Sequence, residues 1–238
     1  MSTIDRLRAR GLAPLALAFA VVAQLGMAAG LASTVGLALP GWLAIGLWTA
    51  LGYALLQPHV DQLGPAGTIT LTRAVLTGGV IGLVADELVV SARPPAVLLT
   101  TLAAVALVLD AVDGLVARHT RTESALGARF DMEVDAALIL ALSVAAIDEV
   151  GVWVVVIGSM RLAFLAASWV TPWMRGALPP SRGRKVVAAW QGVTLAAVVS
   201  QLLPGWPAVA GAALSLALLT WSFGRDIRWL YRRHQQYL

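Results

Sequence analysis

The sequence contains no cysteine, and only 13% of its 238 residues carry a charge. Without cysteine the chain has no disulfide framework, no thiolate metal site and no cysteine nucleophile. A soluble domain carries roughly a quarter charged residues, so a chain with this few cannot cover a water-facing surface. Hydrophobic residues make up 59% of the chain instead. The composition therefore predicts an integral membrane protein.

Long apolar runs predict an all-α membrane protein, because a spanning helix needs about 20 mostly apolar residues. Proline, glycine or charged residues separate these runs from one another. Eight spans are expected, over residues 13–34, 39–57, 68–90, 95–117, 131–149, 152–174, 186–203 and 206–224.

The basic residues predict the orientation of these spans. With eight spans and a cytoplasmic N-terminus, every Arg and Lys except Arg93 and Arg161 falls on the cytoplasmic side. Cytoplasmic loops carry such an excess of positive charge, so we expect a multi-pass plasma-membrane protein with both termini cytoplasmic. The charges are scattered among short loops, so no nucleic-acid partner is expected. The basic segment 225–238 is expected to lie against anionic lipid headgroups.

Four aspartates carry the clearest chemical signal. Asp110 and Asp113 are three residues apart near the end of one predicted helix, and Asp131 and Asp135 are four apart at the start of the next. Each pair therefore lies on one face of its helix, and a short connection lets the two pairs face each other. Carboxylates gathered at a membrane boundary repel one another and are costly to desolvate. A bound divalent cation removes both costs.

Hard oxygen ligands favour Mg²⁺, Mn²⁺ or Ca²⁺ over zinc. Mg²⁺ is typically held by a few carboxylates together with substrate phosphates, which points to a phosphate-bearing substrate, and two ions suit four carboxylates. Gly114 and Gly127 each lie one turn from an aspartate and would let a substrate approach the backbone. Arg118 is one turn beyond Gly114 and can pair with a phosphate.

The full pattern is Asp110-x2-Asp113-Gly114-x2-Ala117-Arg118-x8-Gly127-x3-Asp131-x3-Asp135. It resembles the signature of the CDP-alcohol phosphotransferase (phosphatidyltransferase) family, with every fixed position present. The resemblance implies a six-helix catalytic membrane domain over residues 67–224. An extra transmembrane hairpin and linker (13–66) would precede it, after a basic N-terminus (1–12), and the basic tail (225–238) would follow it.

The family resemblance also implies a reaction. Such enzymes, of the EC 2.7.8 type, bind the CDP moiety in a cytosol-facing cavity and hold two divalent ions, Mg²⁺ or Mn²⁺. Asp110, Asp113 and Asp131 would be metal ligands. Asp135 would be both a ligand and the general base. A phosphatidyl or other phospho-alcohol group would pass from a CDP-linked donor, expected to be CDP-diacylglycerol, to an acceptor alcohol, and CMP would leave. A homodimer is expected from the same likeness.

Further residues are expected to bind substrate. By the same resemblance, Thr70 and Arg73 match a second family element, Asn-x2-Thr-x2-Arg, although Gly67 replaces its Asn. Arg161 lies inside a predicted span, where a charge indicates function. The expected nucleotide-binding residues are Thr70, Arg73, Gly114, Ala117, Arg118 and Gly127. The possible acceptor- or phosphate-binding residues are Arg161, Arg175, Arg184 and Lys185.

Two other functions fit parts of this pattern. An intramembrane prenyltransferase also holds Mg²⁺ and a diphosphate with aspartate motifs at helix ends, but the Gly-x2-Ala-Arg element argues against it. An ion- or proton-coupled transporter would spread its acids through matching broken helices in two halves of the chain. Here the acids cluster in one place, so we expect the phosphotransferase.

Overall fold

The computed structural model describes residues 3–58, 65–120, 125–176, 178–179 and 181–236. For residues 3–13, 65–66, 113–120, 125–126 and 182 it describes the backbone alone. Throughout these ranges the regular structure is helical, and the described residues include no strand. The all-α prediction is therefore confirmed. The chain divides into two compact units, residues 1–138 and 139–238.

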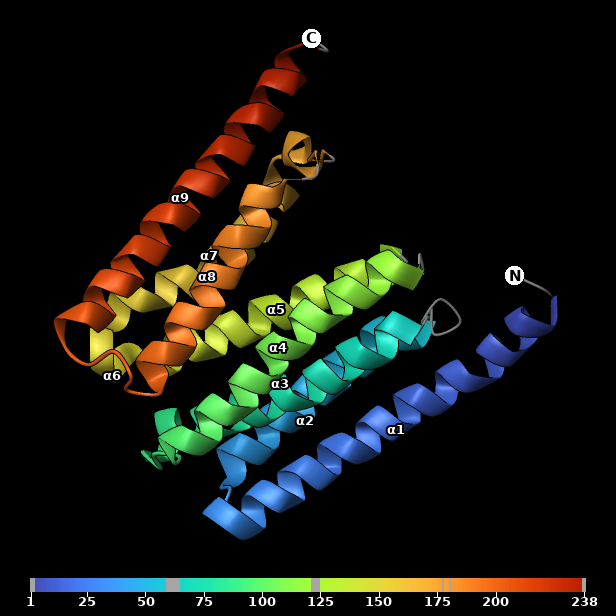
Figure 1. Cartoon of the computed structure of the whole chain (residues 1–238), viewed down its shortest axis with the longest axis vertical. Coiled ribbons are helices and arrows are strands. Elements are labelled where there is room, and N and C mark those ends of the chain that lie inside the picture. The colour runs from blue at the N-terminus through green and yellow to red at the C-terminus, as the bar shows by residue number, and fades with distance from the viewer. Residues whose placement is uncertain (1–2, 59–64, 121–124, 177, 180, 237–238) are drawn as a thin grey trace. The chain divides into compact units, whose positions relative to one another are not determined.

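Helix α3 lies at the centre of the first unit, which also contains α1, α2, α4 and the first part of α5 (Figure 1). It packs against α1, α2 and α4. Gly36, whose φ of +76° suits glycine, follows α1, and Pro40 occupies the first turn of α2, where its missing N–H costs nothing. The bounds are α1 Thr3–Val35, α2 Leu39–Leu56, α3 Pro65–Val90, α4 Ala96–Thr120 and α5 Ala125–Ala145.

Helix α9 organises the second unit. It packs along α8 and also contacts α6, α7 and the short 3₁₀ segments η2 and η3. Gly205, with a φ of +66°, precedes it, and Pro207 fits its first turn. The elements after α5 are α6 Ile147–Val150, η2 Val152–Val154, α7 Val155–Val170, η3 Pro172–Arg175, α8 Arg182–Val199 and α9 Trp206–Gln235.

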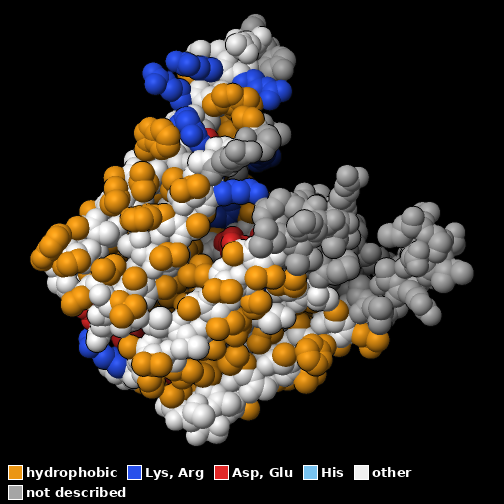
Figure 2. Space-filling view, viewed as in Figure 1, with side chains coloured by type: hydrophobic (Ala, Val, Ile, Leu, Met, Phe, Trp, Pro, Cys, Tyr) orange, Lys and Arg blue, Asp and Glu red, His pale blue; other side chains and the backbone are white. Residues whose placement is uncertain are grey.

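Apolar side chains face outward along the first two helices. Leu15 and Phe19 of α1 are 64% and 74% exposed, and Leu43 and Leu47 of α2 are 64% and 62% exposed. In water such stripes would be unfavourable, but a bilayer solvates them. The space-filling view shows apolar side chains over much of the visible face (Figure 2). These surfaces are those of a membrane protein.

Each of the eight predicted spans corresponds to a helix, but several ends differ from the prediction. Helix α1 begins at Thr3, α5 covers Ala125–Ala145 and α8 ends at Val199. The run predicted over 152–174 stops being α-helical at Val170, because Thr171 precedes a proline and adopts extended backbone angles. At the other end of the chain, α9 continues through the basic tail to Gln235. Its last turn contains Arg232 and Arg233, and Figure 2 shows basic side chains near that end of the chain.

Five described helical segments are long and apolar enough to cross a membrane: 14–35, 39–56, 67–90, 152–170 and 206–235. In α4 the described apolar stretch is shorter, 96–112. Helix α5 carries Arg129, Asp131, Glu133 and Asp135, and α8 begins with three basic residues. Those charges lower the apolarity of both helices, so the count of eight spans stays a prediction.

Candidate metal and phosphate site

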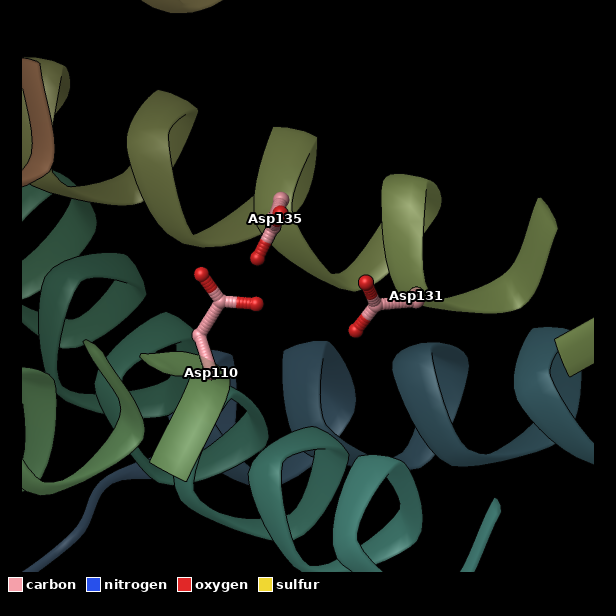
Figure 3. Close-up of side chains that lie close together, drawn as sticks. All are labelled: Asp110, Asp131 and Asp135. Atoms are coloured by element: carbon pink, nitrogen blue, oxygen red, sulfur yellow. The ribbon is translucent and has the colours of Figure 1, made fainter. Parts of the chain in front are cut away.

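Three of the four predicted aspartates lie together. Asp110 is near the last turns of α4, while Asp131 and Asp135 are one turn apart on α5. Each offers one carboxylate oxygen, and these oxygens all lie within 4.8 Å of one another. Figure 3 shows the three side chains pointing toward one another from two helices. The facing arrangement that helical phase predicted is therefore present for these three residues.

The rest of the signature lies partly outside the described side chains. Asp113, Gly114, Ala117 and Arg118 lie on the backbone of α4, but their side chains are outside the described part of the chain. Gly127 is described, and it lies in α5 one turn before Asp131. The predicted roles of these residues stay predictions.

Arg73 of α3 joins the three carboxylates. Its side chain is completely buried, and one guanidinium nitrogen, Nη1, lies 3.1 Å from Oδ1 of Asp110. The same nitrogen pairs with Asp131, and Nη2 pairs with Asp135. A fully buried charge is tolerated only when it is paired and hydrogen-bonded. One guanidinium therefore acts as the common counter-ion of three aspartates on two helices.

The guanidinium of Arg73 also holds the backbone of α4. Its Nε donates to the carbonyl oxygen of Ala106, at 3.2 Å, and that carbonyl lies one turn before Asp110. Thr70 and Thr77 lie one turn on either side of Arg73 and are also buried, at 2% and 0% exposure. The three polar side chains share one face of α3. From this polar face of α3, Arg73 reaches the carboxylates.

The charge balance of the cluster favours a divalent cation. Three carboxylates and one guanidinium leave a formal charge of minus two. The aspartate side chains are 30–44% exposed, so an ion and a ligand can reach them. Hard oxygens at this mutual spacing suit Mg²⁺ or Mn²⁺, which take several oxygen ligands at about 2 Å. The donor set thus fits the predicted metal.

The predicted acceptor-site residues belong to the second unit, where two of them bind protein groups. Arg175 donates to the carbonyl oxygens of Ser168 and Trp169, at 2.8 and 3.2 Å, which caps the C-terminal end of α7. Arg184 pairs with Asp226 of α9 at 3.2 Å and also donates to a backbone carbonyl. These contacts hold η3 and α8 in place.

The other two predicted acceptor-site residues differ in exposure. Arg161 is half-buried in α7, and Lys185 is exposed in the first turn of α8. A phosphate contact for any of the four residues stays a prediction.

Sequence reasoning singled out Arg73 as a nucleotide contact and did not foresee its ion pairs with the aspartates. The signal was present, because Arg73 is the only charged residue between Asp61 and Asp86. Such a charge needs an opposite charge nearby, and three of the signature acids supply it. What the sequence does not give is which face of α3 packs on α4 and α5.

Comparison with known proteins adds one match. Residues 65–222 match the family model of the CDP-alcohol phosphatidyltransferases. The matched segment begins with α3 and extends into α9, so it contains the aspartate cluster and Arg73 but neither α1 nor α2. No curated protein and no solved structure matches the chain.

Proposed function

The chain belongs to the CDP-alcohol phosphatidyltransferase family, and on that premise we propose that it uses CDP-diacylglycerol as its donor. Family membership makes it a transferase of phospholipid synthesis that works in a membrane. In the proposed reaction the phosphatidyl group passes to the hydroxyl of an acceptor alcohol and CMP is released. The observation that carries the proposal is the convergence of Asp110, Asp131 and Asp135 within a complete family signature.

The aspartates are the proposed metal ligands. Asp110, Asp131 and Asp135, with Asp113 as a fourth, would hold Mg²⁺ or Mn²⁺, two ions in all. When bound, the ions neutralise the charge of the diphosphate and of the departing CMP. Phosphoryl transfer needs little covalent help from a protein, so positioning and charge neutralisation supply most of the rate.

Asp135 is the proposed general base. Its carboxylate accepts the proton of the acceptor hydroxyl as that oxygen forms a bond to the β-phosphorus of the donor. The bond from this phosphorus to the oxygen of CMP breaks, and CMP leaves with the bonding electrons. The ion pair with Arg73 supports this role, because a fully buried side chain orients the carboxylate.

The remaining signature residues form the proposed nucleotide site. Gly114 and Gly127 would let the nucleotide approach the backbone, and Arg118 would pair with a phosphate. Thr70 and Arg73 stay proposed members of this site. Arg161, Arg175, Arg184 and Lys185 are the proposed contacts for acceptor or phosphate groups.

A cytoplasmic active site in the plasma membrane and a homodimer complete the proposal. No observation favours a prenyltransferase or a transporter over the proposed phosphatidyltransferase.

A CMP-release assay tests the proposal. The purified protein, in lipid nanodiscs, would be supplied with CDP-diacylglycerol or a CDP-linked polar alcohol, each against a panel of alcohols that includes glycerol phosphate, inositol phosphate and serine. We expect CMP release with CDP-diacylglycerol and one acceptor, loss of activity in EDTA and recovery on adding Mg²⁺ or Mn²⁺. Turnover that persists in EDTA, or an absence of CMP release with every donor, would refute it.

A further inference from the structure

The first two helices lie outside the segment that matches the family, yet they pack directly behind the aspartate cluster. We propose that the hairpin of α1 and α2 is a positioning element for this site, and that α2 sets the location of α3 through Trp48 and of α5 through Phe130. The proposal concerns the geometry of the carboxylates. The kinetic part of its test rests on the proposed reaction, and the Mn²⁺ part rests only on the proposed metal ligands.

Close backbone approach fixes α2 against α3. A Cβ atom built on Gly82 of α3 would lie 2.6 Å from the side chain of Ile45 and 3.4 Å from the carbonyl oxygen of Gly41. The buried carboxylate of Asp86, also on α3, accepts hydrogen bonds from the backbone N–H groups of Ala38 and Gly41, each at 2.6 Å. These N–H groups lie at the N-terminal end of α2, where they have no acceptor within the helix. One end of α2 is therefore held firmly on α3.

Trp48 makes the second attachment, near the site. Its indole N–H donates to the carbonyl oxygen of Ala74 at 2.8 Å. Ala74 directly follows Arg73, whose guanidinium binds the three aspartates. The indole ring thus ties α2 to the backbone of α3 one residue away from the common counter-ion.

A shared apolar cluster makes the third attachment, to α5. Phe130 and Val134, at 3% and 0% exposure, pack with Leu17 of α1, Leu56 of α2 and Leu71 of α3. Each of the two α5 residues directly precedes an aspartate of the site. Successive residues of a helix are turned by about 100° around its axis. Phe130 and Val134 therefore face the hairpin, while Asp131 and Asp135 lie on the adjacent face of α5.

These three attachments have one consequence for the site. A shift of α2 moves Ala74 and Phe130, and through them Arg73 and the carboxylates of α5. Catalytic geometry is sensitive to such shifts, since a displacement of about 1 Å can cost on the order of 100-fold in rate. The hairpin is therefore a support that sets the spacing of the aspartates.

A pair of glycines on α2 allows a matched test. A Cβ on Gly52 would lie in van der Waals contact with the ring of Phe130, at 3.9 Å, so the further atoms of Gly52→Leu would press on this ring, which adjoins Asp131. A Cβ on Gly46 would meet no atom within 4 Å, so Gly46→Leu makes the same chemical change toward open space. We expect Gly52→Leu to weaken Mn²⁺ binding, measured by electron paramagnetic resonance, and to lower kcat, each about tenfold or more. Gly46→Leu should stay within about twofold of the parent in both measurements, since its added side chain meets nothing.

A pair of tryptophans on the same helix gives a second test that adds no bulk. Trp48→Phe removes the donor to Ala74, while Trp42→Phe alters a ring that is 38% exposed. We expect Trp48→Phe to lower kcat with a smaller change in the donor KM and to weaken Mn²⁺ binding several-fold. The melting temperature should fall by only a few degrees, as expected for the loss of one hydrogen bond. Trp42→Phe should leave all four values unchanged.

The Mn²⁺ measurement separates this proposal from the proposed function. If the protein shows no CMP release but Gly52→Leu and Trp48→Phe still weaken Mn²⁺ binding, the reaction is wrong and the positioning role stands. If all four variants bind Mn²⁺ within about twofold of the parent protein, the hairpin does not position the site. Should Gly52→Leu fail to fold, the tryptophan pair decides the question alone.

Discussion

Replacing Arg73 by glutamine tests how the aspartate cluster balances its charge. The substitution removes a buried guanidinium that pairs with Asp110, Asp131 and Asp135. At 4.8 Å, the upper limit of the spacing between their oxygens, two carboxylates repel by about 3.5 kcal/mol at an effective dielectric constant of about 20. Water reaches these side chains and reduces that repulsion. We therefore take about 3 kcal/mol, the low end for breaking a buried ion pair, as the loss of stability in EDTA.

Divalent ions should restore most of the lost stability, because they supply the positive charge that Arg73→Gln removes. For a chain of this size about 3 kcal/mol corresponds to a fall in melting temperature of about 6–12 °C in EDTA. Saturating Mg²⁺ should recover most of this difference. The stabilisation by Mg²⁺ should therefore be larger in the variant than in the parent protein.

Thermal unfolding in detergent, followed by intrinsic tryptophan fluorescence with EDTA and with Mg²⁺, measures both effects. Arg93→Gln is the matched control, since Arg93 is 68% exposed and lies 3.9 Å from Glu87. Exposed pairs contribute about 0–1 kcal/mol, so this control should shift little in either buffer. Equal melting temperatures for Arg73→Gln and the parent in EDTA would refute the counter-ion role. If Mg²⁺ raises the melting temperature of Arg73→Gln by no more than that of the parent, the metal does not replace the positive charge of Arg73.

Three further experiments test the packing around the site and in the second unit. Asp86→Ala should destabilise the protein by about 1–3 kcal/mol in chemical denaturation, because two N–H groups that open α2 lose their acceptor. Gly158→Leu should strongly reduce folded yield in size-exclusion chromatography, because a Cβ there meets the backbone of α5, whereas Gly30→Leu meets open space and should express normally. A double-mutant cycle on Arg184 and Asp226 should give a coupling of about 1 kcal/mol, and zero coupling would show that this pair does not hold α8 to α9.

The sequence predicts the helices of this protein well, because a run of about 20 apolar residues directly indicates a membrane-spanning helix. It also predicts that Asp131 and Asp135 share a helix face and that Asp110 can oppose them, since helical phase depends only on spacing. The end of α7 at Val170 could have been read from Pro172, which restricts the residue before it. The extension of α9 through the tail could not be read from hydropathy, which reports burial rather than helicity.

The features that the sequence does not predict are contacts between helices. The pairing of Arg73 with three aspartates depends on the rotation of α3 relative to α4 and α5. The attachment of Trp48 to Ala74 depends on the glycines that let α2 approach α3 closely. Neither the rotation nor the approach leaves a fixed spacing in the sequence, so only the packed structure reveals them.

The most direct measurement of the central claim is CMP release by Asp135→Asn with CDP-diacylglycerol and the active acceptor. The amide keeps the shape of the side chain but cannot accept the hydroxyl proton as a carboxylate does. We expect release to fall by at least about 100-fold, the range for removing a general base. Donor binding should persist, and Glu133→Gln, which alters a neighbouring acid of α5, should retain activity. Normal turnover by Asp135→Asn would contradict the account.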